Sequence, residues 1–354
     1  MNKSSTKRPF VRPGALDKIE HLSYIAAPLS KQPFRSACQE FSSPSHQASG
    51  KVMPQPDNDV LQRFLFEQSD VRGEIVSLQD SYQAVLANHR RSDQEIPAAI
   101  DTLLGEFLSA AALLSATLKF DGIITLQAKP KNKGALELIM ADSTRHNNLR
   151  AVARYDASNA PSDDQACDFR SLLDGGYLLI TIDPAKGERY QSVIAIEHDS
   201  LSECLNTYFQ QSEQLPTRIW LAADENRAGG LLLQALPVQL QSLEQRSELW
   251  QHLTLLVDTL KVDEQVTLSH RQQLHRLFHQ EELQLFEPTA LQFSCSCSRA
   301  RTASMLISLG EKEIQTMLDE QTRIDVGCEF CHYVYQFNAE QAARLFSTEP
   351  PTLH

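Results

Sequence analysis

The hydrophobic pattern of this chain predicts one long buried helix and a series of strands. Between residues 96 and 118, small and large apolar side chains are interleaved, which is typical of a helix packed against a sheet. Short apolar runs rich in β-branched residues precede and follow it and predict strands. These runs are Val60–Glu67, Ile75–Leu78, Ile123–Gln127, Leu136–Met140, Leu149–Tyr155, Tyr177–Ile182 and Tyr190–Ile196. Because strands follow one another and helices are segregated, we expect an α+β core domain over residues 53–238, not an alternating parallel fold.

Residues 239–292, which we call the linker segment, have a helical pattern with an apolar stripe. The stripe begins at Leu243 and Leu249 and continues through Trp250, Leu253, Leu256, Val257 and Leu260. A second helical stretch surrounds Leu274, Leu277 and Phe278, and a short strand follows at Leu283–Phe286. Amphipathic helices need tertiary packing for stability, so we expect the stripe to rest on the neighbouring domain. Two interpretations stay open: a permanently docked arm, or a segment that docks conditionally. His270, His275 and His279 are expected on a solvated helix face.

Residues 1–52 differ from the rest of the chain. They carry eight basic and three acidic side chains, are rich in Ser and Pro, and show no hydrophobic period, which predicts disorder. Met53 follows directly and opens a globular pattern, so we expect translation to begin there. A tail that binds an acidic partner and a transit peptide are the alternatives.

Composition narrows the function classes. A formal net charge of −12 argues against general nucleic-acid binding, which needs a basic face. The most apolar window, Leu103–Thr117, contains Glu106 and is shorter than the roughly 20 residues that a membrane span requires. Cys38, Cys167 and Cys204 are scattered singly, as in a reducing cytoplasm, where we expect the protein to reside.

Four further cysteines form two close pairs, Cys295-Ser-Cys297 and Cys328-Glu-Phe-Cys331, separated by thirty residues. Two thiol pairs joined by a foldable insert are the ligand pattern of a tetrahedral zinc site. We therefore expect one zinc ion held by Cys295, Cys297, Cys328 and Cys331 in a C-terminal segment, residues 293–348, with a short tail after it. Four protein ligands leave no open position for a catalytic water, so the site is not expected to be enzymatic.

The insert between the cysteine pairs predicts two short helices, Ala303–Leu309 and Glu311–Asp319, broken at Gly310. Strands at Ile324–Val326 and Tyr333–Phe337 predict a hairpin around the second pair. So small a unit buries little apolar surface, and we expect it to fold only with its metal.

Residue chemistry alone leaves two main roles open for this segment. A third, a thiol–disulfide oxidoreductase using Cys328 and Cys331, is disfavoured because the pair lacks the sequence context of a redox fold. One is a static zinc ribbon serving as an adaptor or nucleic-acid-binding module, although the segment has five basic and seven acidic side chains. The other is a redox switch, because thiolates are the form that oxidants attack. A bridge between Cys297 and Cys328 would clamp the insert, whereas bonds within each pair would leave it unconstrained.

The cysteine motif and several stretches of the body resemble the 33 kDa chaperonin family, redox-regulated bacterial heat-shock holdases. The signature is Phe293–Arg299 with Cys328–Cys331 and Tyr335–Phe337. Matching stretches in the body are Arg63–Glu67, Val71–Glu74, Ala116–Gly122, Gly187–Gln191, Ser212–Arg218 and Ala228–Gln234. The resemblance runs from about residue 53 to the C-terminus.

The resemblance implies an ATP-independent chaperone that is inactive while reduced and zinc-bound. Oxidation is then expected to form the disulfides Cys295–Cys297 and Cys328–Cys331, to release zinc and to unfold the linker and C-terminal segments. It further implies a homodimer when oxidised, and unfolded client proteins as partners. One departure is the longer, basic loop Ala128–Gly134, which stands where the family has a glycine-rich turn.

Overall fold

The computed structural model describes residues 57–90, 97–117, 121–132, 136–144, 146–156, 168–212 and 215–346. The chain divides into two units, Met1–Met53 and Pro54–His354, and all described residues belong to the second. The predictions for residues 1–52, the start at Met53, Cys38, Cys167 and the tail 349–354 lie outside the described residues.

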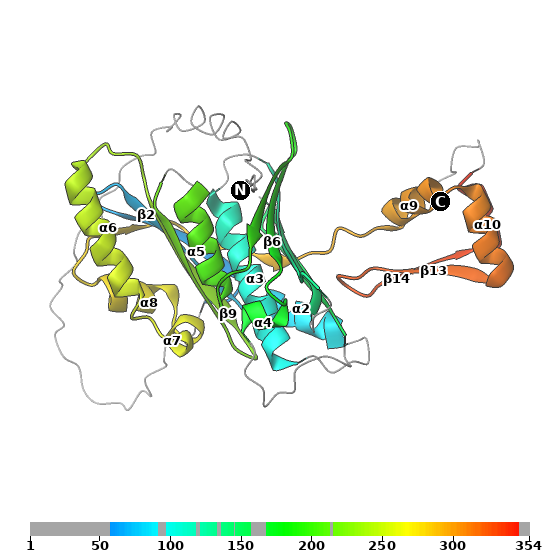
Figure 1. The fold of residues 1–354 in the computed structure, drawn as a ribbon, viewed down its shortest axis with the longest axis horizontal. Helices are drawn as coiled ribbons and strands as arrows, with labels where there is room; N and C mark the ends of the chain where they lie inside the picture. The colour runs from blue at the N-terminus through cyan, green and yellow to red at the C-terminus, as the bar shows by residue number, and fades with distance from the viewer. Residues whose placement is uncertain are drawn as a thin grey trace, which may run out of the picture. The chain divides into compact units, whose positions relative to one another are not determined.

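Two sheets, the first wholly antiparallel, form the body of the second unit (Figure 1). The first sheet has the order β10-β1-β2-β9-β8, and β11 pairs with β1 beside β10. Its strands are β1 (Val60–Phe66), β2 (Val71–Leu78), β8 (Thr217–Ala223), β9 (Ala228–Ala235), β10 (Leu283–Leu285) and β11 (Thr289–Ala290). The second sheet has the order β12-β5-β4-β3-β6-β7. Its strands are β3 (Gly122–Lys129), β4 (Leu136–Thr144), β5 (Asn148–Tyr155), β6 (Tyr177–Pro184), β7 (Tyr190–Ala195) and β12 (Gln292–Phe293).

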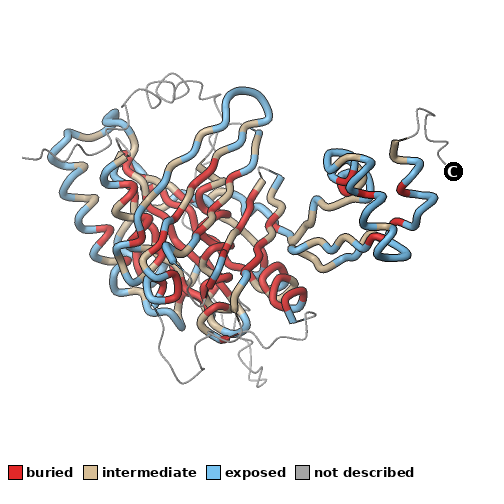
Figure 2. The backbone as a smooth tube through the Cα atoms, turned by 45° about the vertical axis from the view of Figure 1, so that its right-hand side comes forward, coloured by how far each residue is buried: buried red, intermediate tan, exposed pale blue. Residues whose placement is uncertain are grey.

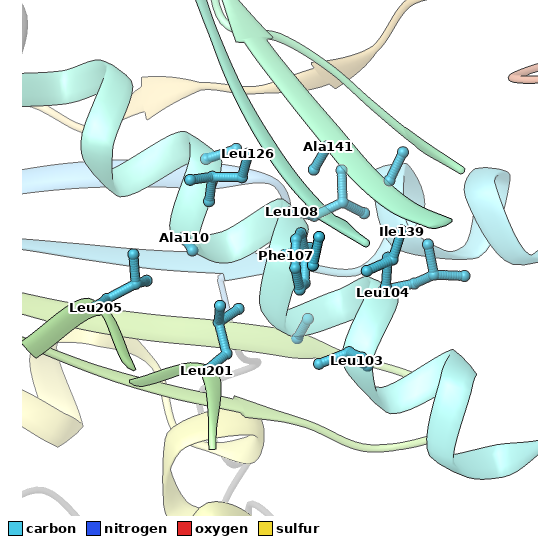
Figure 3. Packing of buried hydrophobic residues seen from close by; sticks show 14 of the residues in the cluster. Leu103, Leu104, Phe107, Leu108, Ala110, Leu126, Ile139, Ala141, Leu201 and Leu205 are labelled. Atoms are coloured by element: carbon cyan, nitrogen blue, oxygen red, sulfur yellow. The ribbon is translucent and has the colours of Figure 1, made fainter. Parts of the chain in front are cut away.

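Helix α3 (Ala98–Thr117) confirms the predicted buried helix and lies between the two sheets together with α5 (Leu201–Ser212) (Figure 1). Side chains from these helices and from both sheets meet in the main apolar cluster. Figure 3 shows Phe107 and Leu108 of α3 among Leu126, Ile139 and Leu205. Helix α2 (Asp80–Arg90) and the short α4 (Phe169–Leu172) complete this layer.

Helix α3 is the one helix in the described part of the chain that is long and apolar enough to cross a membrane. Its most apolar window is 67% buried inside the fold, between two sheets. That burial is expected for the core helix of a globular domain.

The α+β prediction is confirmed, since the described strand pairs are antiparallel except for the short β12–β5 contact. Strand β2 includes the whole Val71–Glu74 stretch, which the hydrophobic pattern had left between two strands. A tertiary contact explains why the strand extends through this polar stretch. The Glu74 carboxylate is fully buried and accepts a 2.7 Å bond from Arg63 of β1, which offsets the cost of burying a charged group.

The linker segment contains three helices and covers the outer face of the first sheet (Figure 1). They are α6 (Leu243–Val257), α7 (Val262–Thr267) and α8 (His270–Phe278). Ser242 and Ser269 start α6 and α8 through capping boxes with Gln245 and Gln272. The hydrophobic pattern alone had not predicted α7.

The C-terminal segment contains the predicted pair of helices and the hairpin. They are α9 (Arg299–Leu309), α10 (Glu311–Glu320), β13 (Arg323–Gly327) and β14 (Val334–Asn338), with α11 (Ala339–Arg344) at the end. Gly310 separates the helices with a φ of 93°, a conformation that favours glycine. Figure 2 shows few buried positions here in contrast to the body. The buried apolar side chains of this cluster are Leu306, Ile314, Ile324, Phe337 and Ala342.

The start of the basic loop is described as far as Asn132. The backbone at Lys129 and Pro130 passes so close to Gly176 that a Cβ there would lie 1.9 Å from the Lys129 oxygen. Asn132 donates a 2.7 Å bond to Asp174. The loop therefore leaves β3 in contact with the turn before β6.

Candidate metal centre and the surface beneath the linker segment

The two predicted cysteine pairs converge in the structure. The sulfur atoms of Cys295, Cys297, Cys328 and Cys331 all lie within 4.8 Å of one another. The shortest separations run between the pairs, 3.5 Å for Cys295–Cys328 and 3.4 Å for Cys297–Cys331. A tetrahedral zinc ion with bonds of about 2.3 Å needs sulfurs about 3.8 Å apart, so the donor set fits zinc.

Local structure explains how the four sulfurs meet. Cys295 and Cys297 follow strand β12, and Ser298 then caps α9 by accepting a bond from the Arg301 amide. Cys328 and Cys331 lie in the turn of the β13–β14 hairpin, where the Cys328 amide bonds to the Tyr333 oxygen at 2.9 Å. Each pair is therefore held by one turn, as the spacing predicted.

The surroundings of the cluster shift the pKa values of its thiols in different directions. Burial raises the pKa of the Cys297 thiol, but hydrogen bonds from Tyr335 and the other sulfurs outweigh it, so the net shift is downward. Burial raises the pKa of Cys295 and of Cys331. A cation bound by the four sulfurs would favour their thiolate forms, which is the chemistry of a thiolate metal site.

Tyr335 was predicted only as a hairpin strand residue. Its hydroxyl lies 3.2 Å from the Cys297 sulfur and donates a hydrogen bond to it. Tyr333, the residue before β14, and Tyr335 are two positions apart and their ring centroids lie 4.7 Å from each other, so both rings are on one side of the chain. This period-two spacing is the sequence signal that could have identified Tyr335. Cys204, by contrast, is buried in α5 far along the chain from this cluster, and burial raises the pKa of its thiol.

The predicted apolar stripe of the linker segment rests on the first sheet. Leu253 and Val257 are fully buried, and Trp250, Leu256 and Leu260 are partly buried in the same cluster. Their partners include Leu274, Leu277 and Phe278 of α8 and the sheet residues Phe64, Phe66, Val71, Ile75, Leu231 and Leu233. The prediction that the stripe needs a neighbouring surface is confirmed.

Leu243 was wrongly assigned to this stripe. It is the first residue of α6 and is 67% exposed, because the helix packs into the apolar cluster only from Leu249 onward. The exposed face expected for the histidines is also wrong for His270, which is 1% exposed. His275 and His279 are exposed as expected.

Polar anchors at both ends of α6 were not apparent from the sequence. The Asp70 carboxylate accepts hydrogen bonds from the amides of Gln239, Leu240 and Gln241. Burial raises the pKa of Asp70, but these donors and Arg246 more than offset it, so the net shift is downward. At the other end, Asp258 accepts two bonds from Arg218, at 3.1 and 3.0 Å.

Trp220 of β8 adds a 2.8 Å bond from its indole nitrogen to the same Asp258 carboxylate. Helix α7 approaches the sheet closely, since a Cβ on Gly229 would lie 3.0 Å from the Gln265 oxygen. The linker segment is therefore fixed to the sheet by apolar packing and by hydrogen bonds at several points.

Comparison with known proteins gives a consistent result. Residues 59–338 match the family described as Hsp33 protein. The 33 kDa chaperonin of Ectopseudomonas mendocina is 48% identical over 82% of this chain and 96% of its own length. That of Pseudomonas aeruginosa is 46% identical over 82% of this chain and 95% of its own.

A crystal structure of the 33 kDa chaperonin from Thermotoga maritima has the same fold, with a TM-score of 0.66. The alignment covers 81% of this chain and 97% of that protein at 21% sequence identity. Since the family model matches most of the chain and the relatives are nearly half identical to it, the chain belongs to the Hsp33 protein family, a family of chaperones rather than enzymes.

Proposed function

We propose that this protein is an ATP-independent holdase that oxidation of its four-cysteine cluster switches on. The observation that carries the proposal is the convergence of four sulfurs within 4.8 Å in a segment whose own apolar cluster is small. Such a segment depends on its metal site for stability, and the metal site depends on reduced sulfur.

Cys295, Cys297, Cys328 and Cys331 would hold one zinc ion in the reduced protein. Bound zinc would supply folding free energy on the order of 10 kcal/mol to the C-terminal segment. The five fully buried apolar side chains of this segment, one of them an alanine, contribute at most about 1.5–3 kcal/mol each. The entropy of ordering the chain offsets most of that, so the thiolate site decides whether the segment is folded.

The redox step concerns the sulfurs alone. A thiolate attacks a peroxide oxygen, giving a sulfenic acid and hydroxide, and the second thiolate of the pair displaces hydroxide to form the disulfide. Each disulfide thus consumes one peroxide and delivers two electrons to it. We assign the bonds to Cys295–Cys297 and Cys328–Cys331, because they remove all four charged donors while leaving residues 298–327 unconstrained.

Unfolding of the C-terminal segment would destabilise the linker segment, because the two are joined by strands that pair with both sheets. Strands β10 and β11 pair with the edge of β1, and β12 pairs with β5 directly before Cys295. Once the linker segment leaves the first sheet, the apolar surface around Phe64, Phe66 and Leu233 is open to unfolded polypeptides. The stripe from Trp250 to Leu260 becomes available at the same time.

The partners of the active form are unfolded or partly folded client proteins. The same exposed apolar surface supports assembly of a homodimer after oxidation. No nucleic acid or membrane takes part in this proposal. The switch needs a compartment that keeps thiols reduced at rest, so we place the protein in the cytoplasm.

The decisive experiment treats the full chain with hypochlorous acid or with peroxide at elevated temperature. Released zinc, free thiols and suppression of aggregation of a heat-denatured client enzyme are measured on the same samples. We expect zinc release and thiol loss to precede suppression, and a reductant to reverse them. Cys204→Ser is the matched control, since its sulfur lies outside the cluster, and it should retain the response that Cys328→Ser loses.

A static zinc ribbon predicts different results. Zinc would then be retained under oxidant, and aggregation would proceed as in the absence of the protein. Full suppression by the reduced, zinc-loaded protein would likewise contradict the proposed switch.

A further inference from the structure

Arg150 of β5 is held rigidly by the body of the protein. Its guanidinium lies 2.6 Å from the Asp142 carboxylate of the neighbouring strand β4 and donates to it through Nε as well. Asp142 also accepts a 2.6 Å bond from the Thr125 hydroxyl of β3. The side chains of Arg150 and Asp142 are only 20% and 7% exposed, so this ion pair keeps a fixed geometry.

The same guanidinium contacts both cysteine loops. Its Nη1 donates a 2.8 Å bond to the hydroxyl of Ser296, the residue between Cys295 and Cys297. Its Cζ lies 4.1 Å from the ring centroid of Phe330, which stands between Cys328 and Cys331. One arginine of the second sheet therefore contacts a residue inside each cysteine pair.

Backbone contacts join the first cysteine loop to the same strand. β12 pairs with β5 in parallel, with Phe293 opposite Leu149. The amide of Ser294 then donates a 3.0 Å bond to the Leu149 oxygen, one residue before Arg150. Cys295 follows directly, so the position of its loop on β5 is set by both backbone and side-chain contacts.

A second arginine of β5 makes a weaker contact. Arg154 donates to Glu329 at 2.7 and 3.2 Å, but both side chains are more than half exposed. Exposed ion pairs contribute little to stability. Arg154 is therefore suited as a comparison for Arg150, on the same strand and against the same cysteine loop.

We propose that Arg150 is a positioning residue that holds the C-terminal segment on the second sheet only while both cysteine loops keep their metal-site conformation. The inference rests on the proposed function and adds a docking step to it. A disulfide brings two sulfurs to about 2.05 Å, whereas a tetrahedral zinc site holds them about 3.8 Å apart. We therefore expect the loops that contain Ser296 and Phe330 to change conformation when their flanking cysteines bond. A change in either loop breaks a contact to Arg150.

Docking and folding of the C-terminal segment are thereby separate events. Removing the Arg150 contacts should undock the segment from β5 without removing its metal, because Arg150 supplies no ligand atom. The undocked, reduced protein should then respond to oxidant at a lower dose than the unaltered chain.

The test compares Arg150→Gln with Arg154→Gln in the full, reduced, zinc-loaded chain. Amide hydrogen exchange is followed at Ser294, whose amide bonds to β5, and zinc content is measured by native mass spectrometry. We expect exchange at Ser294 to accelerate about tenfold or more in Arg150→Gln, since a charge-assisted bond and a cation–π contact are lost together. Arg154→Gln should change it by less than about twofold. Zinc content should stay at one ion per chain in both.

Ser296→Ala removes the acceptor and leaves the ion pair of Arg150 intact, so it tests the idea if Arg150→Gln folds poorly. It should also accelerate exchange at Ser294. The Ser296 hydroxyl accepts a 2.8 Å bond from Arg301 as well, so the double variant with Arg150→Gln should exceed Arg150→Gln alone by less than the effect of Ser296→Ala in the unaltered chain. Unchanged exchange of the Ser294 amide in both single variants would overturn the proposal. Equal acceleration of amide exchange at Ser294 and throughout β4 would also overturn it, because that result would mean general destabilisation. These measurements use only the reduced protein, so they stand or fall separately from the oxidative chaperone assay.

Discussion

We predict that His270 makes docking of the linker segment sensitive to pH. It is the first residue of α8, and its ring is enclosed between α8 and the first sheet. Nε2 lies 2.9 Å from the Ser77 hydroxyl of β2, and Nδ1 lies 3.4 Å from the Gln62 side-chain oxygen of β1. The Gln62 oxygen can only accept, so the neutral ring donates from Nδ1 and accepts at Nε2.

Burial lowers the pKa of His270 from 6.5 to about 4, and the Asp57 carboxylate, 3.9 Å away, opposes that shift. Because the pKa is lower in the docked state, docking is most stable above pH 6.5 and weakens as pH falls toward 4. The difference in pKa corresponds to about 3 kcal/mol at full protonation, and to about 1.4 kcal/mol at pH 5.5.

The assay is urea unfolding of the linker segment at pH 7 and pH 5.5, followed by tryptophan fluorescence. Trp220 and Trp250 are the two tryptophans of the chain, and both pack at the surface beneath the linker segment. His270→Gln cannot titrate and should lose most of the difference between the two pH values. His275→Gln, exposed on the same helix, should keep it. Equal pH dependence in His270→Gln and the unaltered chain would refute the reasoning.

Three further outcomes are expected. Leu253→Ala should destabilise linker docking by about 2–4 kcal/mol, measured by urea titration, and should lower the oxidant dose for activation, measured by the client assay. Leu255→Ala changes a position that is 66% exposed and should have neither effect. Tyr335→Phe should accelerate alkylation of Cys297 in the zinc-loaded protein about 3–10 times, because the sulfur loses a hydrogen bond that withdraws charge from it. Tyr333→Phe should leave the alkylation rate of Cys297 unchanged. Peptide mass mapping measures the alkylation in both variants. A zinc chelator under reducing conditions should remove amide protection from α9 and α10 and leave α3 protected; retained protection in α9 would contradict metal-dependent folding.

Local sequence patterns were sufficient for most elements and for the ligand cluster. Apolar interleaving between residues 96 and 118 predicted α3, and glycine at position 310 predicted the break between α9 and α10. The cysteine spacing predicted a four-sulfur site, and the sulfurs meet within 4.8 Å. These predictions succeed because their causes lie within one helix or one turn.

Long-range contacts explain the failures. His270 was expected on a polar face because its sequence neighbours are charged and Gln-rich. In the structure its ring is buried and forms a hydrogen bond with Ser77, which lies nearly two hundred residues earlier in the chain. The stripe was extended to Leu243 because periodicity does not reveal where the supporting sheet ends. Helix α7 is short and weakly patterned, and its close approach depends on Gly229 of a distant strand.

The sequence by itself therefore determined the α+β core, the amphipathic linker pattern and the two cysteine pairs that form the four-sulfur cluster. Only the tertiary structure decided which surface the linker segment covers, and that Arg150 of β5 meets both cysteine loops. The physical reason is that helical periodicity and ligand spacing are set by neighbouring residues, whereas burial and pairing depend on which distant segments the fold brings into contact.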